Sequence, residues 1–282
     1  MPITQLVAND VRYQEGAVPF TALQRDPRFS YCLYVPPGLP RGRPARVLIA
    51  VHGTERRAES YREAFIDLAQ RWQLIVLAPL FPCGIAGRYD HSSYKFIRYE
   101  GIEYDQILWQ MLAQVAEDYP ILQDQLLMFG FSGGGHFAHR MLWLHPQRFA
   151  AVAIGAPGVI TLPEPTLSWW RGVADMHSLF ARQWQPEQVA RVRILLIAGA
   201  DDFETDEIAI TPDSPLWRED LQQLGSTRVA RLQELAASLQ RQSIPFELQW
   251  LPGVGHDARP LAPAVNHFFH QYLQSCQVSD SD

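Results

Sequence analysis

Short apolar runs recur along this chain and alternate with longer segments whose apolar residues are spaced as on one face of a helix. The runs are rich in Val, Ile, Leu and Ala and are bounded by Gly or Pro, which is typical of strands buried on both faces. The predicted strands are Tyr31–Val35, Arg46–His52, Leu74–Pro79, Gln125–Phe131, Ala150–Gly155, Ile194–Gly199 and Phe246–Leu251. The predicted helices are Glu59–Trp72, Tyr104–Tyr119, Gly134–His145, one within Pro215–Gln242, and Pro260–Ser275. This alternation predicts an α/β fold whose mostly parallel sheet is covered by helices on both faces.

Three segments do not follow the alternation. Residues 1–28 have weak periodicity and are interpreted as an arm or a covering strand. Residues 83–101 form a long, polar and aromatic stretch directly after a predicted strand. Residues 159–191 are too long for a plain crossover between two strands. Because long loops in compact domains are usually functional or contain helices, we expect 159–191 to be a short cap insertion.

Composition limits the class of protein. The chain has 282 residues, of which 47% are hydrophobic and 19% charged. This balance predicts a single packed domain that spans residues 1–282. The formal net charge is −6 and no run is rich in Lys or Arg, so neither nucleic acid nor an anionic membrane is an expected partner.

Other sequence signals bear on location and cofactors. The N-terminal residues lack the charged and apolar regions of a signal peptide, and no apolar stretch is long enough to span a bilayer. The cysteines Cys32, Cys83 and Cys276 are sparse and odd in number, which favours reduced thiols and a cytoplasmic location. No His or Cys spacing matches a zinc site, so we expect neither a metal nor a cofactor.

The strongest chemical signal is the sequence Gly130-Phe131-Ser132-Gly133-Gly134, between a predicted strand and a predicted helix. It has the G-x-S-x-G pattern of a nucleophile elbow, a tight turn that holds a serine hydroxyl above the sheet. Small flanking residues let strand and helix approach closely. A phosphate-binding loop is disfavoured because the chain has no G-K-[ST] and no G-x-G-x-x-G in the matching context. Ser132 is therefore the candidate nucleophile.

With this motif, the chain resembles the α/β-hydrolase superfamily, and is similar to small esterases of the dienelactone-hydrolase and polyester-depolymerase type. The resemblance covers nearly the whole chain, from Tyr31 to about Leu273. Four pieces match the family in order: Val51-His52-Gly53-Thr54, the elbow at Ser132, Ile197-Ala198-Gly199-Ala200-Asp201-Asp202, and Gly253-Val254-Gly255-His256-Asp257. The family also often inserts a cap at the position of residues 159–191.

The resemblance implies a Ser-His-Asp triad, with the partners in the chain order Ser, acid, His. His256 then serves as the base, because serine is a poor nucleophile without one. The family pattern Gly-x-x-Asp selects Asp202 as the acid. Asp201 is the runner-up, and Asp206 remains an alternative if its loop folds back.

The resemblance also implies an oxyanion hole made of two backbone N–H groups, those of Gly133 and Thr54. His136 and His139 follow the nucleophile on the predicted helix, and we interpret them as packing or pocket-lining residues. His52 precedes the oxyanion glycine and is expected to shape that loop rather than to transfer protons.

These features predict a serine hydrolase that cleaves a small-molecule carboxylic ester through an acyl-enzyme. A peptidase, thioesterase or acyltransferase with the same triad is the alternative within enzymes, and a ligand-binding protein on the same fold is the alternative outside them.

The substrate is not evident from the sequence. Three aromatic residues of the cap segment, Trp169, Trp170 and Phe180, are candidate substrate-binding residues and suggest an apolar or aromatic acyl group. Five basic residues are candidates for binding a carboxylate, although a solvated surface charge is the more common role of such residues. They are Arg56, Arg57, Arg88, Lys95 and Arg98.

Overall fold

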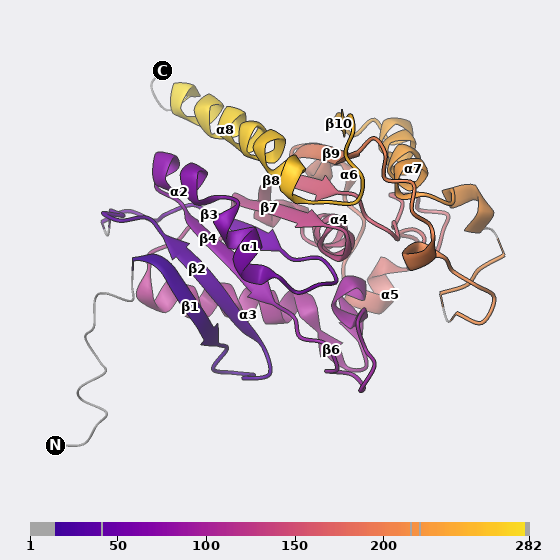
Figure 1. Cartoon of the computed structure of the whole chain (residues 1–282), viewed down its shortest axis with the longest axis horizontal. Coiled ribbons are helices and arrows are strands. Elements are labelled where there is room, and N and C mark those ends of the chain that lie inside the picture. The colour runs from indigo at the N-terminus through magenta and orange to yellow at the C-terminus, as the bar shows by residue number, and fades with distance from the viewer. Residues whose placement is uncertain (1–14, 41, 215, 220, 280–282) are drawn as a thin grey trace.

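The computed structural model describes residues 15–40, 42–214, 216–219 and 221–279. Its centre is one eight-stranded sheet with the strand order β1-β2-β4-β3-β7-β8-β9-β10. β2 pairs antiparallel with both β1 and β4, and every other neighbouring pair in this sheet is parallel. The predicted class, a mostly parallel sheet with helices around it, is confirmed (Figure 1).

Strands and helices alternate along most of the described chain. The strands are β1 (Gly16–Ala22), β2 (Ser30–Val35), β3 (Val47–Val51), β4 (Ile75–Leu80), β5 (Arg98–Tyr99), β6 (Ile102–Glu103), β7 (Leu126–Phe131), β8 (Phe149–Gly155), β9 (Arg193–Gly199) and β10 (Glu247–Leu251). The α-helices are α1 (Ala58–Glu63), α2 (Ile66–Trp72), α3 (Tyr104–Asp118), α4 (Gly133–Leu144), α5 (Met176–Phe180), α6 (Pro186–Val189), α7 (Arg228–Arg241) and α8 (Ala262–Ser279). The 3-10 helices are η3 (Ser93–Phe96), η4 (Pro146–Arg148), η5 (Asp206–Ile208), η6 (Leu221–Leu224) and η7 (Arg259–Leu261). Within the described residues, no helix has both the length and the apolar character to cross a membrane.

The predicted strands are all present, with ends that shift by one residue at most. One predicted helix is wrong in its continuity, because Glu59–Trp72 is divided into α1 and α2. The break lies at Ala64 and Phe65, where Phe65 leaves the helical conformation and is completely buried. The N-terminal segment contains an edge strand, β1, while residues 1–14 lie outside the described residues.

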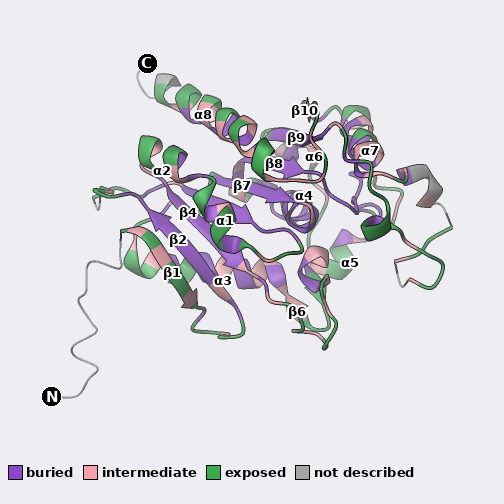
Figure 2. Cartoon of the chain, viewed as in Figure 1, coloured by how far each residue is buried: buried purple, intermediate pink, exposed green. Residues whose placement is uncertain are grey.

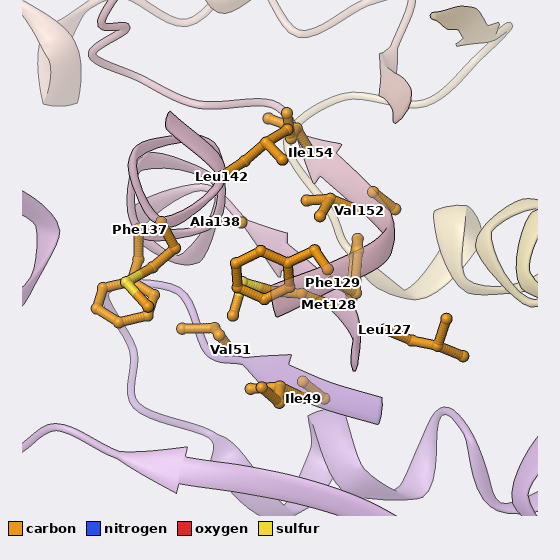
Figure 3. Close-up of a cluster of buried hydrophobic side chains, with 14 of the residues drawn as sticks. Ile49, Val51, Leu127, Met128, Phe129, Phe137, Ala138, Leu142, Val152 and Ile154 are labelled. Carbon is orange, nitrogen blue, oxygen red and sulfur yellow. The ribbon is translucent and has the colours of Figure 1, made fainter. Parts of the chain in front are cut away.

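Apolar burial on the two faces of the sheet holds the layers together (Figure 2). On one face, the Phe65 ring contacts Phe129 of β7 at 5.6 Å between centroids and Phe269 of α8 at 6.2 Å. On the other face, Phe137 of α4 contacts Phe81 at 5.1 Å. Figure 3 shows the side chains of β3, β7, β8 and α4 that fill the centre of this core.

The sheet brings one end of four strands together. β3, β7, β9 and β10 run parallel, so the segments that follow them emerge at the same edge of the sheet. The predicted oxyanion loop follows β3, Ser132 follows β7, Asp202 follows β9 and His256 follows β10. The fold therefore places the four sequence pieces at one edge although they are far apart in the chain.

Candidate active site

Ser132 lies in the turn between β7 and α4 with a strained backbone, φ 54° and ψ −115°. A positive φ is uncommon for a residue with a side chain, and such strain is concentrated at functional sites. The turn is held because the Ser132 N–H donates to the carbonyl of Gly155 at 2.9 Å and the Ser132 carbonyl accepts from the N–H of His136 at 3.1 Å. The side chain is only partly buried, so the hydroxyl lies at an accessible turn.

The glycines of the elbow are required by close backbone approach. A Cβ at Gly130 would lie 2.0 Å from the carbonyl oxygen of Gly134. A Cβ at Gly134 would lie 2.2 Å from the carbonyl oxygen of Val51 in β3. Because real Cβ atoms do not approach backbone oxygens this closely, the G-x-S-x-G pattern has a steric cause at both outer positions.

His256 is hydrogen-bonded to Asp202. Its Nδ1 lies 2.6 Å from Oδ2 of Asp202, which is buried, whereas the neighbouring Asp201 is exposed. The His256 ring also stacks on Phe131, with 4.7 Å between the centroids. A Cβ at Gly199 would lie 2.1 Å from the carbonyl oxygen of Val254. This glycine therefore lets the histidine loop, the loop after β10 that contains His256, approach the end of β9. The contact with Asp202 leaves Nε2 as the ring nitrogen available for proton transfer.

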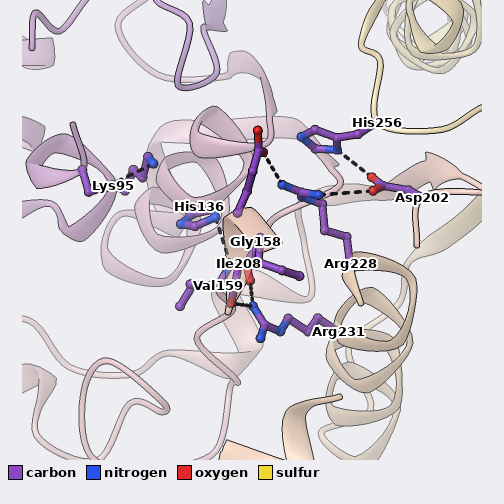
Figure 4. A network of polar contacts seen from close by, with 11 residues as sticks. Lys95, His136, Gly158, Val159, Asp202, Ile208, Arg228, Arg231 and His256 are labelled. Atoms are coloured by element: carbon purple, nitrogen blue, oxygen red, sulfur yellow. Dashed lines mark hydrogen bonds and ion pairs between the residues drawn. The ribbon is translucent and has the colours of Figure 1, made fainter. Parts of the chain in front are cut away.

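Sequence reasoning missed Arg228, at the start of α7. Its side chain is buried, and its guanidinium lies 3.4 Å from Oδ1 of Asp202 and 2.8 Å from Oε2 of Glu207 (Figure 4). Asp202 is therefore held by His256 on one oxygen and by Arg228 on the other. No local motif marks Arg228, which is 26 residues from Asp202 in the chain.

The loop after β3, which is the predicted oxyanion loop, lies against Ser132. A Cβ at Gly53 would lie 3.5 Å from the Ser132 Cβ. The described residues offer no hydrogen-bond acceptor to the N–H of Thr54. The N–H of Gly133 is in the first turn of α4, where amides have no acceptor within the helix. Two unpaired N–H groups therefore come from the two loops that meet at Ser132.

His52 contacts the backbone of the loop after β3 and of Phe81 through its two ring nitrogens. Its Nδ1 lies 2.8 Å from the Gly53 carbonyl, and its Nε2 accepts from the N–H of Phe81 at 3.0 Å. Complete burial lowers the pKa of His52 to about 3. The ring is thus neutral, with both nitrogens engaged by the backbone.

Lys95 lies beside Gly133, the residue that follows Ser132. A Cβ at Gly133 would lie 2.8 Å from Lys95 Cε and 2.3 Å from the Tyr94 hydroxyl, so both side chains pack directly over this glycine. Lys95 is the only lysine among the 24 Lys and Arg residues of the chain. Its Nζ donates to the Ser92 hydroxyl at 3.2 Å. Burial first, and then the charges of Arg56 and Arg140, lower the pKa of Lys95 to about 8.

Polar side chains of α4 bind the start of the cap segment. Nε2 of His136 accepts from the N–H of Val159 at 2.9 Å, and Nε2 of His139 accepts from the N–H of Thr161 at 2.9 Å. Arg140 donates to the Thr161 hydroxyl at 2.9 Å and to the Lys95 carbonyl. α4 therefore connects the 83–101 loop with residues 159–191.

Of the three aromatic candidates in residues 159–191, Trp169 contacts α4, through Arg140. The Trp169 ring contacts Phe180 at 4.7 Å, and the Arg140 guanidinium lies 5.7 Å from the Trp169 centroid. Trp170 is buried in the core, and its carbonyl accepts from the Thr161 hydroxyl at 2.5 Å. The role of these three residues in substrate binding stays a prediction.

The remaining basic candidates differ from Lys95 in their partners. Arg56 donates to the backbone carbonyls of Phe81, Thr54 and His91. Arg57 and Arg98 pair with acidic side chains, and Arg88 is exposed beside Tyr89. Across the described ranges, no group of His, Cys, Asp and Glu is arranged to hold a metal ion.

Neither a protein-family model nor a curated protein sequence matches the chain. Solved structures do match, and they show that the chain has the α/β-hydrolase fold. Poly(aspartic acid) hydrolase-1 from Sphingomonas sp. KT-1 is 19% identical, with a TM-score of 0.71 over 90% of this chain and 98% of that one. The poly(3-hydroxybutyrate) depolymerase LpqC from Bordetella parapertussis is 23% identical, with a TM-score of 0.68 over 90% and 89%. An S-formylglutathione hydrolase from Staphylococcus aureus is 17% identical, with a TM-score of 0.59 over 92% and 98%.

Proposed function

We propose that this protein is a serine hydrolase that cleaves a carboxylic ester through an acyl-enzyme on Ser132. The observation that carries the proposal is the strained elbow at Ser132, which lies at the same edge of the sheet as the hydrogen-bonded pair His256 and Asp202. The similar structures, which are described as hydrolases, depolymerases and esterases, support this class of reaction.

The proposed reaction has two steps. In the first, Ser132 attacks the ester carbonyl while His256 accepts the hydroxyl proton and passes it to the departing alcohol. Asp202 holds the imidazole with its proton on Nδ1, so that Nε2 acts as the base. In the second, a water molecule that gives its proton to His256 attacks the acyl-enzyme and releases the acid.

The proposed oxyanion hole consists of the N–H groups of Gly133 and Thr54. Both are without a partner in the described part of the chain, and they come from loops that meet at Ser132. They would donate to the carbonyl oxygen as it becomes negative in the tetrahedral intermediate. One such donor typically contributes about 3 to 4 kcal/mol of transition-state stabilisation.

We further propose that residues 1–282 form one domain and that 159–191 is a cap within it. This segment contains α5 and α6, and its first residues bind the nucleophile helix through His136 and His139. At its other side, Arg98 of β5 donates to the Leu179 carbonyl and lies over the Phe180 ring at 5.4 Å. Residues 159–191 thus contact both α4, which follows the proposed catalytic serine, and the 83–101 loop.

Turnover of p-nitrophenyl acetate and butyrate tests the proposed function. The wild-type protein should release many equivalents of p-nitrophenol, and Ser132→Ala should lose about a millionfold in kcat. Matching thioester and anilide substrates distinguish an esterase from a thioesterase or a peptidase. Release of one equivalent or less by the wild type would indicate a binding protein and contradict the proposal.

A further inference from the structure

Two positive side chains near Ser132, Lys95 and Arg140, contact no acidic side chain in the described residues, although the chain as a whole carries a net charge of −6. Among the described residues, the Lys95 amine has one hydrogen-bond partner, the neutral hydroxyl of Ser92. Arg140, fully buried, donates to the Thr161 hydroxyl and the Lys95 carbonyl. In the part of the chain that the structure describes, neither residue forms an ion pair with a carboxylate. A buried charge without an opposite charge is costly, so its persistence calls for a ligand or another role.

A second, independent observation is an unpaired donor on α4. His136 is buried, and its Nε2 accepts from the N–H of Val159 at 2.9 Å. The neutral ring therefore carries its proton on Nδ1, and this buried atom has no partner among the described residues. Nη2 of Arg140 is buried and unpaired in the same way. Such orphaned donors are rare in folded proteins because leaving them unpaired costs free energy.

Lys95, His136 and Arg140 form what we call the Lys95 cluster. The N–H of His136 donates to the Ser132 carbonyl, and Arg140 donates to the Lys95 carbonyl. Lys95 packs over Gly133, whose N–H is one proposed oxyanion donor. Figure 4 shows His136 between Lys95 on one side and Arg228 on the other. The charges of Lys95 and Arg140 both contribute, after burial, to lowering the pKa of His136 well below its usual value. The three residues therefore share one electrostatic environment.

We propose that the Lys95 cluster binds a carboxylate group of the ester substrate, so that the preferred substrates are anionic esters. This inference rests on the proposed function and names its substrate class. The Lys95 ammonium would form the charge-assisted contact with the carboxylate, because it is the partly exposed member of the cluster. Arg140 and His136 would add positive potential and unpaired donors from the buried side. The charges of Glu207 and Asp90 raise the pKa of Lys95, but neither side chain contacts its amine.

Matched pairs of esters test this assignment. Ethyl hydrogen glutarate and ethyl 4-carbamoylbutanoate differ only by a carboxylate or a carboxamide on the acyl side, and 4-acetoxybenzoate and 4-acetoxybenzamide differ in the same way on the alcohol side. The wild type should prefer the acid of at least one pair in kcat/KM. In Lys95→Met and Lys95→Gln, this acid-to-amide ratio should fall by about 10- to 100-fold.

The matched control is Arg71→Met, which removes one exposed positive charge from α2 and should leave the ratio unchanged. A wild-type ratio near one in both pairs would overturn the proposal. So would an equal loss on acid and amide in the Lys95 variants, because the lysine would then act on the reaction in general rather than on the carboxylate.

A measurement without turnover separates this proposal from the proposed function. Reductive methylation with ¹³C-formaldehyde labels the single lysine, and the Lys95→Met variant identifies its resonance. Glutarate should shift that resonance in a saturable way, and neutral glutaramide should not. If no ester is hydrolysed but glutarate still binds, the proposed function fails while the carboxylate site stands. Equal or absent shifts with the two compounds would overturn the site itself.

Discussion

Two polar clusters flank Ser132, and they differ in how their charges are balanced. On one side, Asp202 is held by His256 and Arg228, and Arg228 is also paired with Glu207. On the other side, Lys95 and Arg140 have hydroxyl and carbonyl partners but no contacting carboxylate in the described residues. The charges of the first cluster are balanced within the protein, as the proposed triad requires. The charges of the second are not balanced by a contacting carboxylate in the described residues, which is what the proposed binding of an anionic substrate would require.

Within the two clusters, the largest effect on kcat is expected at Asp202. Asp202→Asn should lower kcat by about four orders of magnitude, because the amide would stabilise the wrong tautomer of His256. Asp201→Asn is the control and should change kcat little, since Asp201 is exposed beside the contact. Steady-state kinetics with a neutral ester measures both. Equal losses of kcat in the two variants would contradict the assignment of Asp202 as the acid that orients His256.

Arg228 tests whether the second contact of Asp202 matters. Arg228→Met should lower kcat by about 10- to 100-fold with little change in KM, because one oxygen of the buried carboxylate loses its charged donor. Arg228→Lys should recover part of the loss. Arg259→Met, which removes an exposed arginine from the histidine loop, is the control. A wild-type kcat in Arg228→Met would show that His256 alone positions the acid.

The Lys95 cluster predicts that the preference for anionic substrates depends on pH. With its pKa lowered to about 8, the Lys95 amine is charged below that pH and neutral above it. The acid-to-amide ratio of kcat/KM, in which ionisation of the triad cancels, should therefore fall about tenfold or more as pH rises through about 8. In Lys95→Arg the ratio should stay high, because arginine remains protonated. Burial sets this midpoint first. The charges of Arg56 and Arg140 lower the pKa of Lys95 further, those of Glu207 and Asp90 raise it, and His136 is the neighbouring titratable ring on which the charge of Lys95 acts. A ratio independent of pH in the wild type would contradict the assignment.

The smallest effect is expected at the cap. Trp169 is half-buried and contacts Phe180, whereas Trp170 belongs to the core. Trp169→Ala should change the preferred acyl-chain length by a few-fold in kcat/KM, while Trp170→Ala should mainly lower stability, by about 3 to 5 kcal/mol. An ester series and thermal unfolding measure the two responses. An unchanged chain-length profile in Trp169→Ala would make this part of 159–191 structural only.

Much of the fold could be predicted because its signals are local. Strands buried on both faces are continuous apolar runs, and the elbow glycines are required by backbone contacts such as that of Gly130 with Gly134. The family pattern Gly-x-x-Asp selects Asp202 over Asp201, and Asp202 is the one that contacts His256. The break near Phe65 could not be predicted, because the helical spacing of apolar residues continues through it and only packing against Phe129 and Phe269 requires the turn.

The clusters around Ser132 could be predicted only in part. Arg228 reaches Asp202 through the packing of α7, and the pattern of α7 is that of an ordinary amphipathic helix. His136 and Arg140 lie on a helix that is buried throughout, where polar residues are usually unfavourable. That conflict is one usable signal, and the presence of a single lysine in the chain is the other. Neither signal specifies which residues come together in space.

The central claim is that Ser132 is the nucleophile of a serine hydrolase, and covalent labelling with a fluorophosphonate tests it most directly. Intact-mass analysis should show one adduct on the wild-type protein, and peptide mapping should place it on Ser132. The Ser132→Ala variant should remain unlabelled, and His256→Ala should be labelled far more slowly, since the serine then lacks its base. A single adduct at another residue, or equal labelling of the wild type and Ser132→Ala, would contradict the account.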